Sequence, residues 1–493
     1  MNEIDTAIVT DNTVTKTIYS DGLKGILASR LDSGDVDEAM KMFVTKQSEA
    51  LDALREYNPD THKIMSRPNK GRKNKVPYET NKLPLPEQKR ITDIAVFFML
   101  GNPLKFYLRN TKEEVDELSP YFEIFMNFLE ELYFNERMRD ARRIAGSETE
   151  CAKIFHTYRK GNDIKVKINI LANSKNDKLY TLFNRYGDLV SFAHEYYMCN
   201  EKMEVIRHID VYTDEYTYEC QLPKGTIWDI RKIANPYGKI PIIYYNQERE
   251  WAGVQKRIDR LEWLESKGAD TTEYFNDPYL KVSADLVSKM LADPEVVGKA
   301  VQVQNKDSVF EFVTPPDAGE LMINEKKDLK KSINDATFTP DFSGESIKGL
   351  GTLSAKAIQK MSLPGYIKRE IRASIYNELI RREINLIITI LTKLIYVDQS
   401  DVVSGLKRLK IGFEYQDPFI GGFDDNSDAI QLLRSCDAMS IRTAVEQNPN
   451  VRDKELEVER IFDEKKRLAE IEASATATTQ NTDVNNTVVA EGE

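Results

Sequence analysis

Residues 344–349 have the glycine spacing of a phosphate-binding loop. In such a loop a lysine and then a serine or threonine follow the second glycine, and the lysine reaches the terminal phosphates of a nucleotide. This chain has Leu350 and Gly351 at those two positions. A turn, predicted from the Thr-Pro-Asp sequence at 339–341, precedes the loop instead of a strand. The sequence therefore does not predict nucleotide binding, and we interpret these glycines as a source of backbone flexibility.

Histidines and cysteines are too scattered for metal binding or nucleophilic catalysis. The spacings typical of zinc ligands are absent from both sets. The residues are His62, His156, His194 and His208, with Cys151, Cys199, Cys220 and Cys436. We expect no metal, no cofactor and reduced thiols, and we interpret His208 and Asp210, which share one face of a predicted strand, as a structural pair. No two carboxylates are expected in an apolar setting that would raise a pKa for acid–base catalysis, so we predict no enzyme activity.

Charge and length restrict the classes of partner. The 493 residues carry a formal net charge of −11, with 41% hydrophobic and 30% charged residues, which predicts two to four soluble domains. An acidic chain is not expected to grip nucleic acid tightly or to read its sequence, although loose sliding contact with DNA is allowed. The longest apolar stretch, 384–396, is broken by polar residues and is too short for a membrane span.

Three helical segments surround the glycine loop. The first, 246–276, has Asn246 as its expected N-cap and apolar residues at steps of three or four: Trp251, Val254, Ile258, Leu261 and Leu264. The second, 320–336, has a narrow apolar seam of Leu321, Leu329, Ile333 and Ala336 beside the lysines Lys326, Lys327, Lys330 and Lys331. The third, 353–395, contains Pro364 and Gly365, which leaves one bent helix and two stacked helices as alternatives.

The remaining pattern predicts an α+β chain. Helices are expected at 36–57, 91–100, 113–145, 284–291, 428–436, 440–447 and 454–472. Strands are expected at 166–171, 189–195, 205–213, 216–222, 240–245, 301–304, 309–313 and 409–415, with Asp214 and Glu215 turning 205–222 into a hairpin. We interpret the basic run 67–75 as a solvated loop and the tail 473–493, which has no periodicity, as disordered.

Four short patterns occur in one order along the chain. The first comprises Leu83, Pro84, Gln88 and Lys89, then Phe97, Phe98, Leu100, Gly101, Asn102 and Pro103. The second comprises Gly238, Lys239, Ile240, Pro241, Ile242 and Ile243, then Val254, Ile258, Asp259, Glu262 and Ser266. The third comprises Thr339, Pro340, Asp341, Ser343 and Gly344, then Leu350 to Ala355. The fourth comprises Met439, Ser440, Thr443, Ala444, Pro449, Val451, Asp453, Glu455, Glu457, Arg460 and Ile461.

From about Val76 to Leu468 the chain resembles tailed-bacteriophage portal proteins, the head-to-tail connectors of long-tailed phages. Two features depart from that pattern: Pro364 and Gly365 interrupt a helix that is usually continuous, and the lysine cluster is dense for a channel-side helix. The resemblance implies a portal fold with these parts: an N-terminal region 1–82, a wing 83–245, a stem helix 246–277, a clip 278–318, a stem helix 319–337, a tunnel loop 338–352, a long wing helix 353–397, a wing strand and loop 398–426, crown helices 427–472 and the tail 473–493.

The resemblance further implies a dodecameric ring at one capsid vertex. Double-stranded DNA would pass through it without sequence specificity, past the tunnel-loop residues Phe338, Thr339, Pro340, Asp341, Ser343, Gly344, Lys348, Gly349 and Gly351. The implied partners are the terminase packaging motor, head–tail adaptors, and major capsid and scaffold proteins, with assembly in the host cytoplasm and a final location in the virion. The four stem lysines would contact phosphates weakly, or pair with Glu325 and Asp328. A capsid or scaffold protein without a channel, and a nucleic-acid-processing enzyme, are the alternatives.

Overall fold

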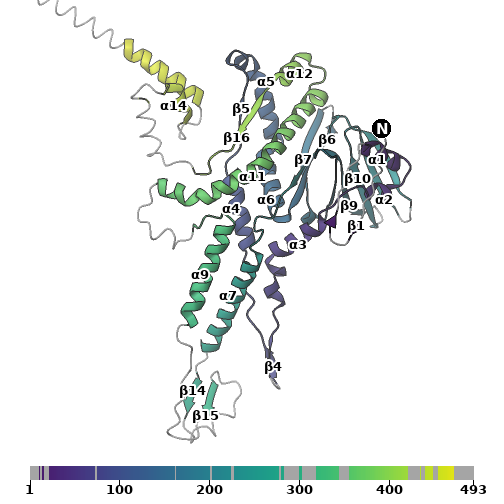
Figure 1. Cartoon of the computed structure of the whole chain (residues 1–493). Helices are drawn as coiled ribbons and strands as arrows, with labels where there is room; N and C mark the ends of the chain where they lie inside the picture. Colours follow the sequence, from purple (N-terminus) through teal and green to yellow (C-terminus); the bar gives the residue numbers. More distant parts are fainter. Residues whose placement is uncertain are drawn as a thin grey trace, which may run out of the picture. The chain divides into compact units, whose positions relative to one another are not determined.

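The computed structural model describes most of the chain. The described residues are 10–11, 14–15, 22–72, 75–161, 163–199, 203–223, 227–276, 279–282, 299–302, 318–342, 355–419, 434, 439–447 and 454–470. The chain divides into two compact units, one made of residues 1–343 and 361–418 and the other of residues 344–360 and 419–493. Helices and strands both contribute to the first unit, which confirms the α+β prediction (Figure 1).

A five-stranded antiparallel sheet lies in the first unit, in the order β12-β11-β10-β9-β8. Its strands are β8 (Lys178–Phe183), β9 (Leu189–Cys199), β10 (Val205–Tyr212), β11 (Tyr216–Leu222) and β12 (Asp229–Ala234). The predicted 205–222 hairpin is confirmed, since Tyr212 pairs with Thr217 across the turn. Helices α1 (Leu23–Asp32) and α2 (Val36–Met40) pack their apolar residues against one face of this sheet.

The largest core gathers helices around a second antiparallel sheet, β13-β6-β7. That sheet consists of β6 (Glu150–Lys160), β7 (Asp163–Leu171) and β13 (Ile242–Asn246). The helices are α4 (Glu87–Leu100), α5 (Lys112–Glu131), α6 (Phe134–Glu148), α11 (Ala355–Ile390) and α12 (Ser400–Arg408). A short pair, β5 (Lys105–Leu108) with β16 (Ile411–Glu414), joins residues distant in sequence and lies where a strand was predicted at 409–415.

Two predicted helices are each divided. The 113–145 prediction is interrupted at Tyr133, whose φ of 51° lies in the left-handed region and ends α5 before α6 begins. The 36–57 prediction is divided into α2 and α3 (Gln47–Tyr57), because Val44 between them bonds to Thr181 of β8. The basic run 67–75 is not only a loop, since β3 (Lys70–Arg72) and β4 (Lys75–Tyr78) pair there. Short helices follow α3 at Pro59–Thr61 and Lys63–Ser66, and another is Asn173–Lys175.

Helix α11 is one continuous helix through Pro364 and Gly365, which decides between the two alternatives for this segment. A π-helical turn, Leu391–Ile395, follows it. Gly365 is required by a close approach: a Cβ atom there would lie 2.6 Å from the ring of Phe98 on α4. The glycine that predicted a possible break therefore permits tight helix packing.

The first stem helix begins later than predicted. Gly253 has a φ of 79°, residues 250–254 form turns, and α7 runs only from Gln255 to Asn276. Asn246 ends β13 and is not an N-cap. The second stem helix, α9 (Ala318–Ala336), agrees in position, but of its expected seam only Ile333 is buried, Leu329 is half-buried, and Leu321 and Ala336 are exposed.

Between these helices, β14 (Tyr279–Val282) pairs in parallel with β15 (Lys299–Gln302), which overlaps the strand predicted at 301–304. The predictions at 284–291 and 309–313 lie outside the described residues. The pair β1 (Thr10–Asp11) and β2 (Val14–Thr15) is also present. The second unit contains the first turn of α11, α14 (Ile441–Gln447) and a helix at 454–470, where helices were predicted. Apart from Arg434, the 428–436 prediction and the tail lie outside the described residues.

Candidate functional site

Helices α7 and α9 lie side by side and are joined by ion pairs along their length (Figure 1). The Arg260 guanidinium of α7 lies 2.9 Å from the Glu325 carboxylate of α9. The Lys326 ammonium of α9 lies 2.9 Å from Glu265 of α7. A Cβ at Gly268 would contact Lys326 and Met322 at 3.4 Å, so the glycine lets the helices approach closely. Ion pairs, and not the apolar seam predicted for 320–336, thus make most of the contact between α7 and α9.

The apolar residues predicted to pack the stem are buried at its base. Trp251, Val254, Ile258 and Leu261 share one cluster with Ile333 of α9 and with Ala53 and Ile91, and Leu264 is buried as well. Trp251 and Val254 occupy the turns before α7. The Trp251 indole N–H donates to the Glu56 carboxylate at 2.9 Å and thereby ties α3 to this base. The apolar contacts of the stem are therefore concentrated near residue 258, where it joins the rest of unit one.

One polar stripe of α7 binds the chain segment 62–85. Asp259, Glu262, Ser266 and Asp270 follow one another at three- and four-residue steps. The Lys63 ammonium lies 2.7 Å from Asp259, and the backbone N–H of Leu83 donates to the Ser266 hydroxyl at 2.9 Å. The further donors to this stripe are Leu85 N–H to Glu262 at 2.8 Å, and Asn81 N–H and Arg67 to Asp270 at 2.8 and 2.6 Å. The Ile-Asp…Glu…Ser pattern noted in the sequence is thus a binding stripe for an extended segment.

His62 is the buried centre of that contact. Its Nδ1 lies 2.6 Å from Glu262 Oε1 and its Nε2 lies 2.7 Å from the Glu56 carbonyl oxygen, and both side chains of the His62–Glu262 pair are fully buried. Both ring nitrogens lie within hydrogen-bonding distance of an oxygen atom, and the imidazolium form can donate to both. Burial by itself favours the neutral ring, but the hydrogen bond and charge of Glu262 outweigh it and raise the pKa of His62.

The four stem lysines differ in their surroundings. Lys326 is half-buried and pairs with Glu265. Lys327, Lys330 and Lys331 are exposed and make no ion pair with any described residue. Within one chain Glu325 is held by Arg260 of α7, and pairing of these lysines with Glu325 and Asp328 from stem to stem stays a prediction. Three cations on one helix are therefore left available to a ligand or another chain.

The start of the predicted tunnel loop is held against α4. Thr339 and Pro340 are buried, and the Thr337 and Thr339 hydroxyls lie 2.8 Å apart. The ring of Phe342 stacks on that of Phe98, with centroids 6.4 Å apart. Phe338 is exposed, with a φ of 49°. Asp341 is described too, whereas Ser343, Gly344, Lys348, Gly349 and Gly351 lie outside the described residues.

Comparison with known families matches residues 44–470 to the model described as phage portal protein, SPP1 Gp6-like. That match covers most of the chain. The chain belongs to this family of phage portal proteins. No curated protein matches the chain. The family places it among the bacteriophage head–tail connectors that act in DNA packaging, and thus among virion proteins. Proteins of this family are generally structural and not enzymes.

A buried charge cluster on this portal chain was not predicted from the sequence. The Glu250 carboxylate lies 2.7 Å from Arg142 of α6 and 3.0 Å from Lys368 of α11. Burial opposes its ionisation, but Arg142, Lys368 and Arg372 together lower the pKa of Glu250 to about 2. A second buried pair joins Lys153 of β6 to Glu383 of α11 at 2.5 Å, where burial raises the pKa of Glu383. The first cluster fastens α11 to α6 and to the turns before α7, and the second fastens α11 to β6.

The expectation that no two carboxylates would lie in an apolar setting is wrong. Glu148 and Glu150 are both buried, and burial raises the pKa of each. Glu150 accepts from the Tyr244 hydroxyl at 2.7 Å, and Glu148 accepts from the Ser174 backbone N–H at 2.9 Å. The Glu148 bond holds the turn after β7, and the Glu150 bond joins β6 to β13. Likewise, His208 stacks on Tyr196, whose hydroxyl donates to Asp210, so a tyrosine connects the expected His208–Asp210 pair.

Among the described residues no group of histidine, cysteine and carboxylate side chains could hold a metal ion. Cys151, Cys199 and Cys220 are free thiols, and Cys436 lies outside the described residues. No helix in the described part of the chain combines the length and apolarity needed to cross a bilayer.

Proposed function

We propose that the chain forms a closed dodecameric ring at one capsid vertex, through which DNA is packaged and ejected. The observation that carries the proposal is the family match together with the α7–α9 pair. In that pair the carboxylates of α7 are occupied by segment 62–85 and by α9, while three lysines of α9 remain available. The negative charge of α7 is therefore balanced within the subunit, and the pair can line a passage without a further helix of its own chain.

The parts of the subunit keep the assignments that the resemblance implies. Residues 246–277 and 319–337 form the stem, with α7 beginning at Gln255, and 278–318 form the clip. Residues 338–352 form the tunnel loop, 353–397 the long wing helix and 427–472 the crown. The wing comprises 83–245 and 398–426. The anchoring of the tunnel loop at Phe98 supports this assignment, because a loop in a passage needs one fixed end from which to extend.

An acidic ring suits a conduit for DNA. Each chain contributes a formal charge of −11, so twelve copies repel phosphates from most of the wall within a Debye length of about 8 to 10 Å. Lys327, Lys330 and Lys331 supply a few cations per subunit that contact phosphates weakly and in any sequence. The DNA then remains centred and mobile.

Partners follow from the same role. The clip faces the terminase motor during packaging and head–tail adaptors afterwards, and the wing meets capsid and scaffold proteins. The ring is built in the host cytoplasm and remains in the virion.

Negative-stain electron microscopy with light scattering on the purified protein tests the proposal. Closed rings with a central hole and a mass near twelve chains are the expected result. Filaments or closed shells would favour a scaffold or capsid role, and ATP turnover by the purified protein would favour an enzyme. Either outcome would contradict the ring channel.

A further inference from the structure

A hollow of about 520 Å³ lies between α11 and the sheets of the first unit, and its lining has more cationic than anionic side chains. Four cationic residues and two carboxylates line it, in a chain whose overall charge is negative. One of the carboxylates, Asp214, is already paired with Lys24 at 2.5 Å. The other, Glu378, makes no ion pair with any described residue. A positive hollow on an acidic subunit is suited to an anionic partner.

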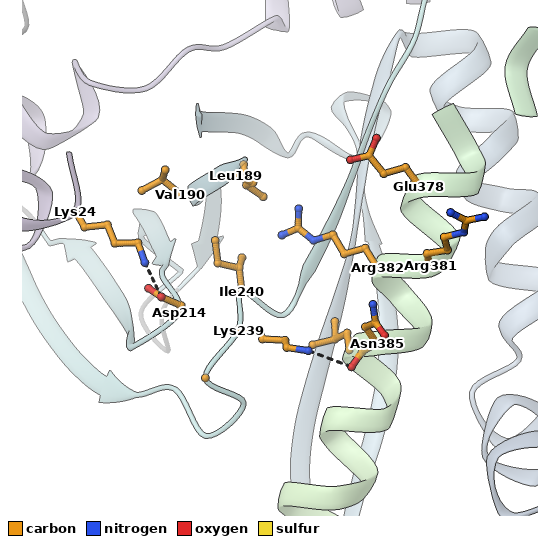
Figure 2. Close-up of a pocket in the computed structure, with 12 residues that line it drawn as sticks. Lys24, Leu189, Val190, Asp214, Lys239, Ile240, Glu378, Arg381, Arg382 and Asn385 are labelled. Carbon is orange, nitrogen blue, oxygen red and sulfur yellow. Dashed lines mark hydrogen bonds and ion pairs between the residues drawn. The ribbon is translucent and has the colours of Figure 1, made fainter. Parts of the chain in front are cut away.

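Arg382 is the central group of this hollow. Figure 2 shows its guanidinium pointing from α11 into the hollow, toward Ile240. Arg382 is half-buried and makes no hydrogen bond or ion pair with a described residue. Burial is the largest influence on the group and lowers the pKa of Arg382, although Asp188 and Glu378 oppose the shift. A partly desolvated guanidinium that no described carboxylate binds directly is an incomplete bidentate site.

Further cations extend the positive surface. Lys239 lies across the hollow, and within the described part of the chain its ammonium donates only to the Asn385 carbonyl oxygen, at 3.4 Å (Figure 2). Arg381 points from α11 away from Arg382 and also lines a second hollow of about 360 Å³, together with the exposed Arg109. The same hollow is lined by Arg369, which pairs with Glu370, and by the exposed Glu414, so its cations outnumber its carboxylates by one. Neither Arg381 nor Arg109 has an ion pair with a described residue. We call Lys239, Arg381, Arg382 and Arg109 the basic ridge.

Helix α5 carries a complementary surface. Asp116, Glu123 and Glu130 are exposed at seven-residue spacing, so they lie on one side of α5, about 10 Å apart, and none pairs with a described residue. We call them the acidic ridge. The apolar side chains of α5 and α11 enter the same core, whereas the acidic ridge of α5 is exposed to solvent. The two ridges share no residue, and a head-to-tail ring contact joins two such unlike residue sets of neighbouring subunits.

We propose that the basic ridge receives the acidic ridge of a second copy of this chain, as the charged part of the contact between neighbouring subunits. The inference rests on the proposed ring. A protein partner fits better than DNA, because the hollow also presents the apolar side chains of Leu189, Val190 and Ile240, which a phosphate backbone would leave uncovered.

Charge exchange between the ridges tests this contact. Arg381→Glu with Arg382→Glu makes one variant, and Asp116→Lys with Glu123→Lys and Glu130→Lys makes the other. Each alone should fail to form rings, with association weakened about a hundredfold, because like charges then meet. Mixed together, the two variants should form rings again, alternating around the ring, since each reversed ridge meets its complement. Light scattering and native mass spectrometry report ring mass and composition.

Lys89→Glu with Lys160→Glu is the matched control, because it makes the same change in charge at exposed lysines outside both ridges. It should assemble like the wild type. Rings formed by either reversed variant alone, or a mixture of the two that stays unassembled, would overturn the ridge contact. If the wild type forms rings in the same experiment, the proposed function still holds. A wild-type chain that forms no ring would contradict both. If the reversed variants fail to fold, Arg381→Gln with Arg382→Gln should still weaken assembly about tenfold, and unchanged assembly would overturn the contact.

Discussion

At the scale of single residues, the His62–Glu262 pair makes the base of the stem sensitive to pH. The raised pKa of His62 means that the folded state holds its proton more tightly than the unfolded chain does, with an ordinary value of 6.5. The pair therefore contributes stability that is fully present below pH 6.5 and is lost as pH rises through the higher folded-state pKa. A buried charge pair of this kind joins segment 62–85 to α7 most firmly at mildly acidic pH.

His62→Ala tests this contribution. The variant leaves the Glu262 carboxylate buried without its imidazolium partner, and we expect a decrease of about 3 to 5 kcal/mol in unfolding free energy at pH 6. The difference from the wild type should shrink toward pH 8 and above. Urea unfolding followed by tryptophan fluorescence measures the unfolding free energy, because Trp251 lies just before α7 and Trp263 lies within it. His62→Gln, which keeps a donor but cannot be charged, should be less destabilising. Parallel pH profiles for wild type and variant would contradict the assignment.

At the scale of elements, the crossing of α4 and α11 depends on Gly365. A methyl group there would lie 2.6 Å from the Phe98 ring, and that ring also stacks on Phe342 at the start of the proposed tunnel loop. Gly365→Ala should therefore destabilise the first unit by about 1 to 3 kcal/mol, because the helices must move apart. It should also raise backbone hydrogen exchange at 338–342, where the loop would no longer be supported.

Gly25→Ala in α1 is the matched helical control. Among the described residues, no atom outside the adjoining turns of α1 lies within 4 Å of the position that its Cβ would occupy. Alanine should therefore stabilise α1 by about 0.5 to 1 kcal/mol through helix propensity alone. Thermal unfolding that changed in the same direction for both glycines would show that propensity, and not the contact with Phe98, governs Gly365.

The same elements show how far sequence patterns reach. Hydrophobic alternation predicted the 205–222 hairpin, and helical spacing located α9, α11 and α14 to within a few residues, because those patterns reflect local backbone geometry. The late start of α7 was missed because a positive φ at Gly253 is not distinguishable in sequence from a tolerated helical glycine. Gly365 suggests a possible break for the same reason.

Buried charges were the larger omission at the candidate site. Glu250, Glu262 and Glu383 look like ordinary surface glutamates in sequence, and their partners Arg142, His62 and Lys153 lie 108, 200 and 230 residues away. Only tertiary packing brings each pair together, and no local pattern encodes it. The one usable signal was the Ile-Asp…Glu…Ser spacing on α7, whose polar stripe the structure explains through segment 62–85.

At the scale of the whole molecule, the proposed channel combines a strongly acidic ring with a small set of exposed stem lysines. If Lys327, Lys330 and Lys331 contact phosphates, binding of DNA to the ring should be weak, independent of sequence and steeply dependent on salt. Changing all three lysines to glutamine should then weaken DNA binding at low salt. It should also flatten the slope of log affinity against log salt concentration by about 0.9 for each phosphate that the variant no longer neutralises.

The matched control changes Lys89, Lys160 and Lys407 to glutamine. These lysines are exposed, lie outside α7 and α9, and have no ion pair with a described residue, so the control alters the total charge of the ring equally. Fluorescence anisotropy of labelled DNA across a salt series compares the two. Equal slopes for both variants would show that only the overall charge matters, and that the α9 lysines serve contacts between subunits instead. A flatter salt dependence for the α9 variant alone would place the phosphates beside α9, because the total charge of the ring changes equally in the α9 variant and in the control.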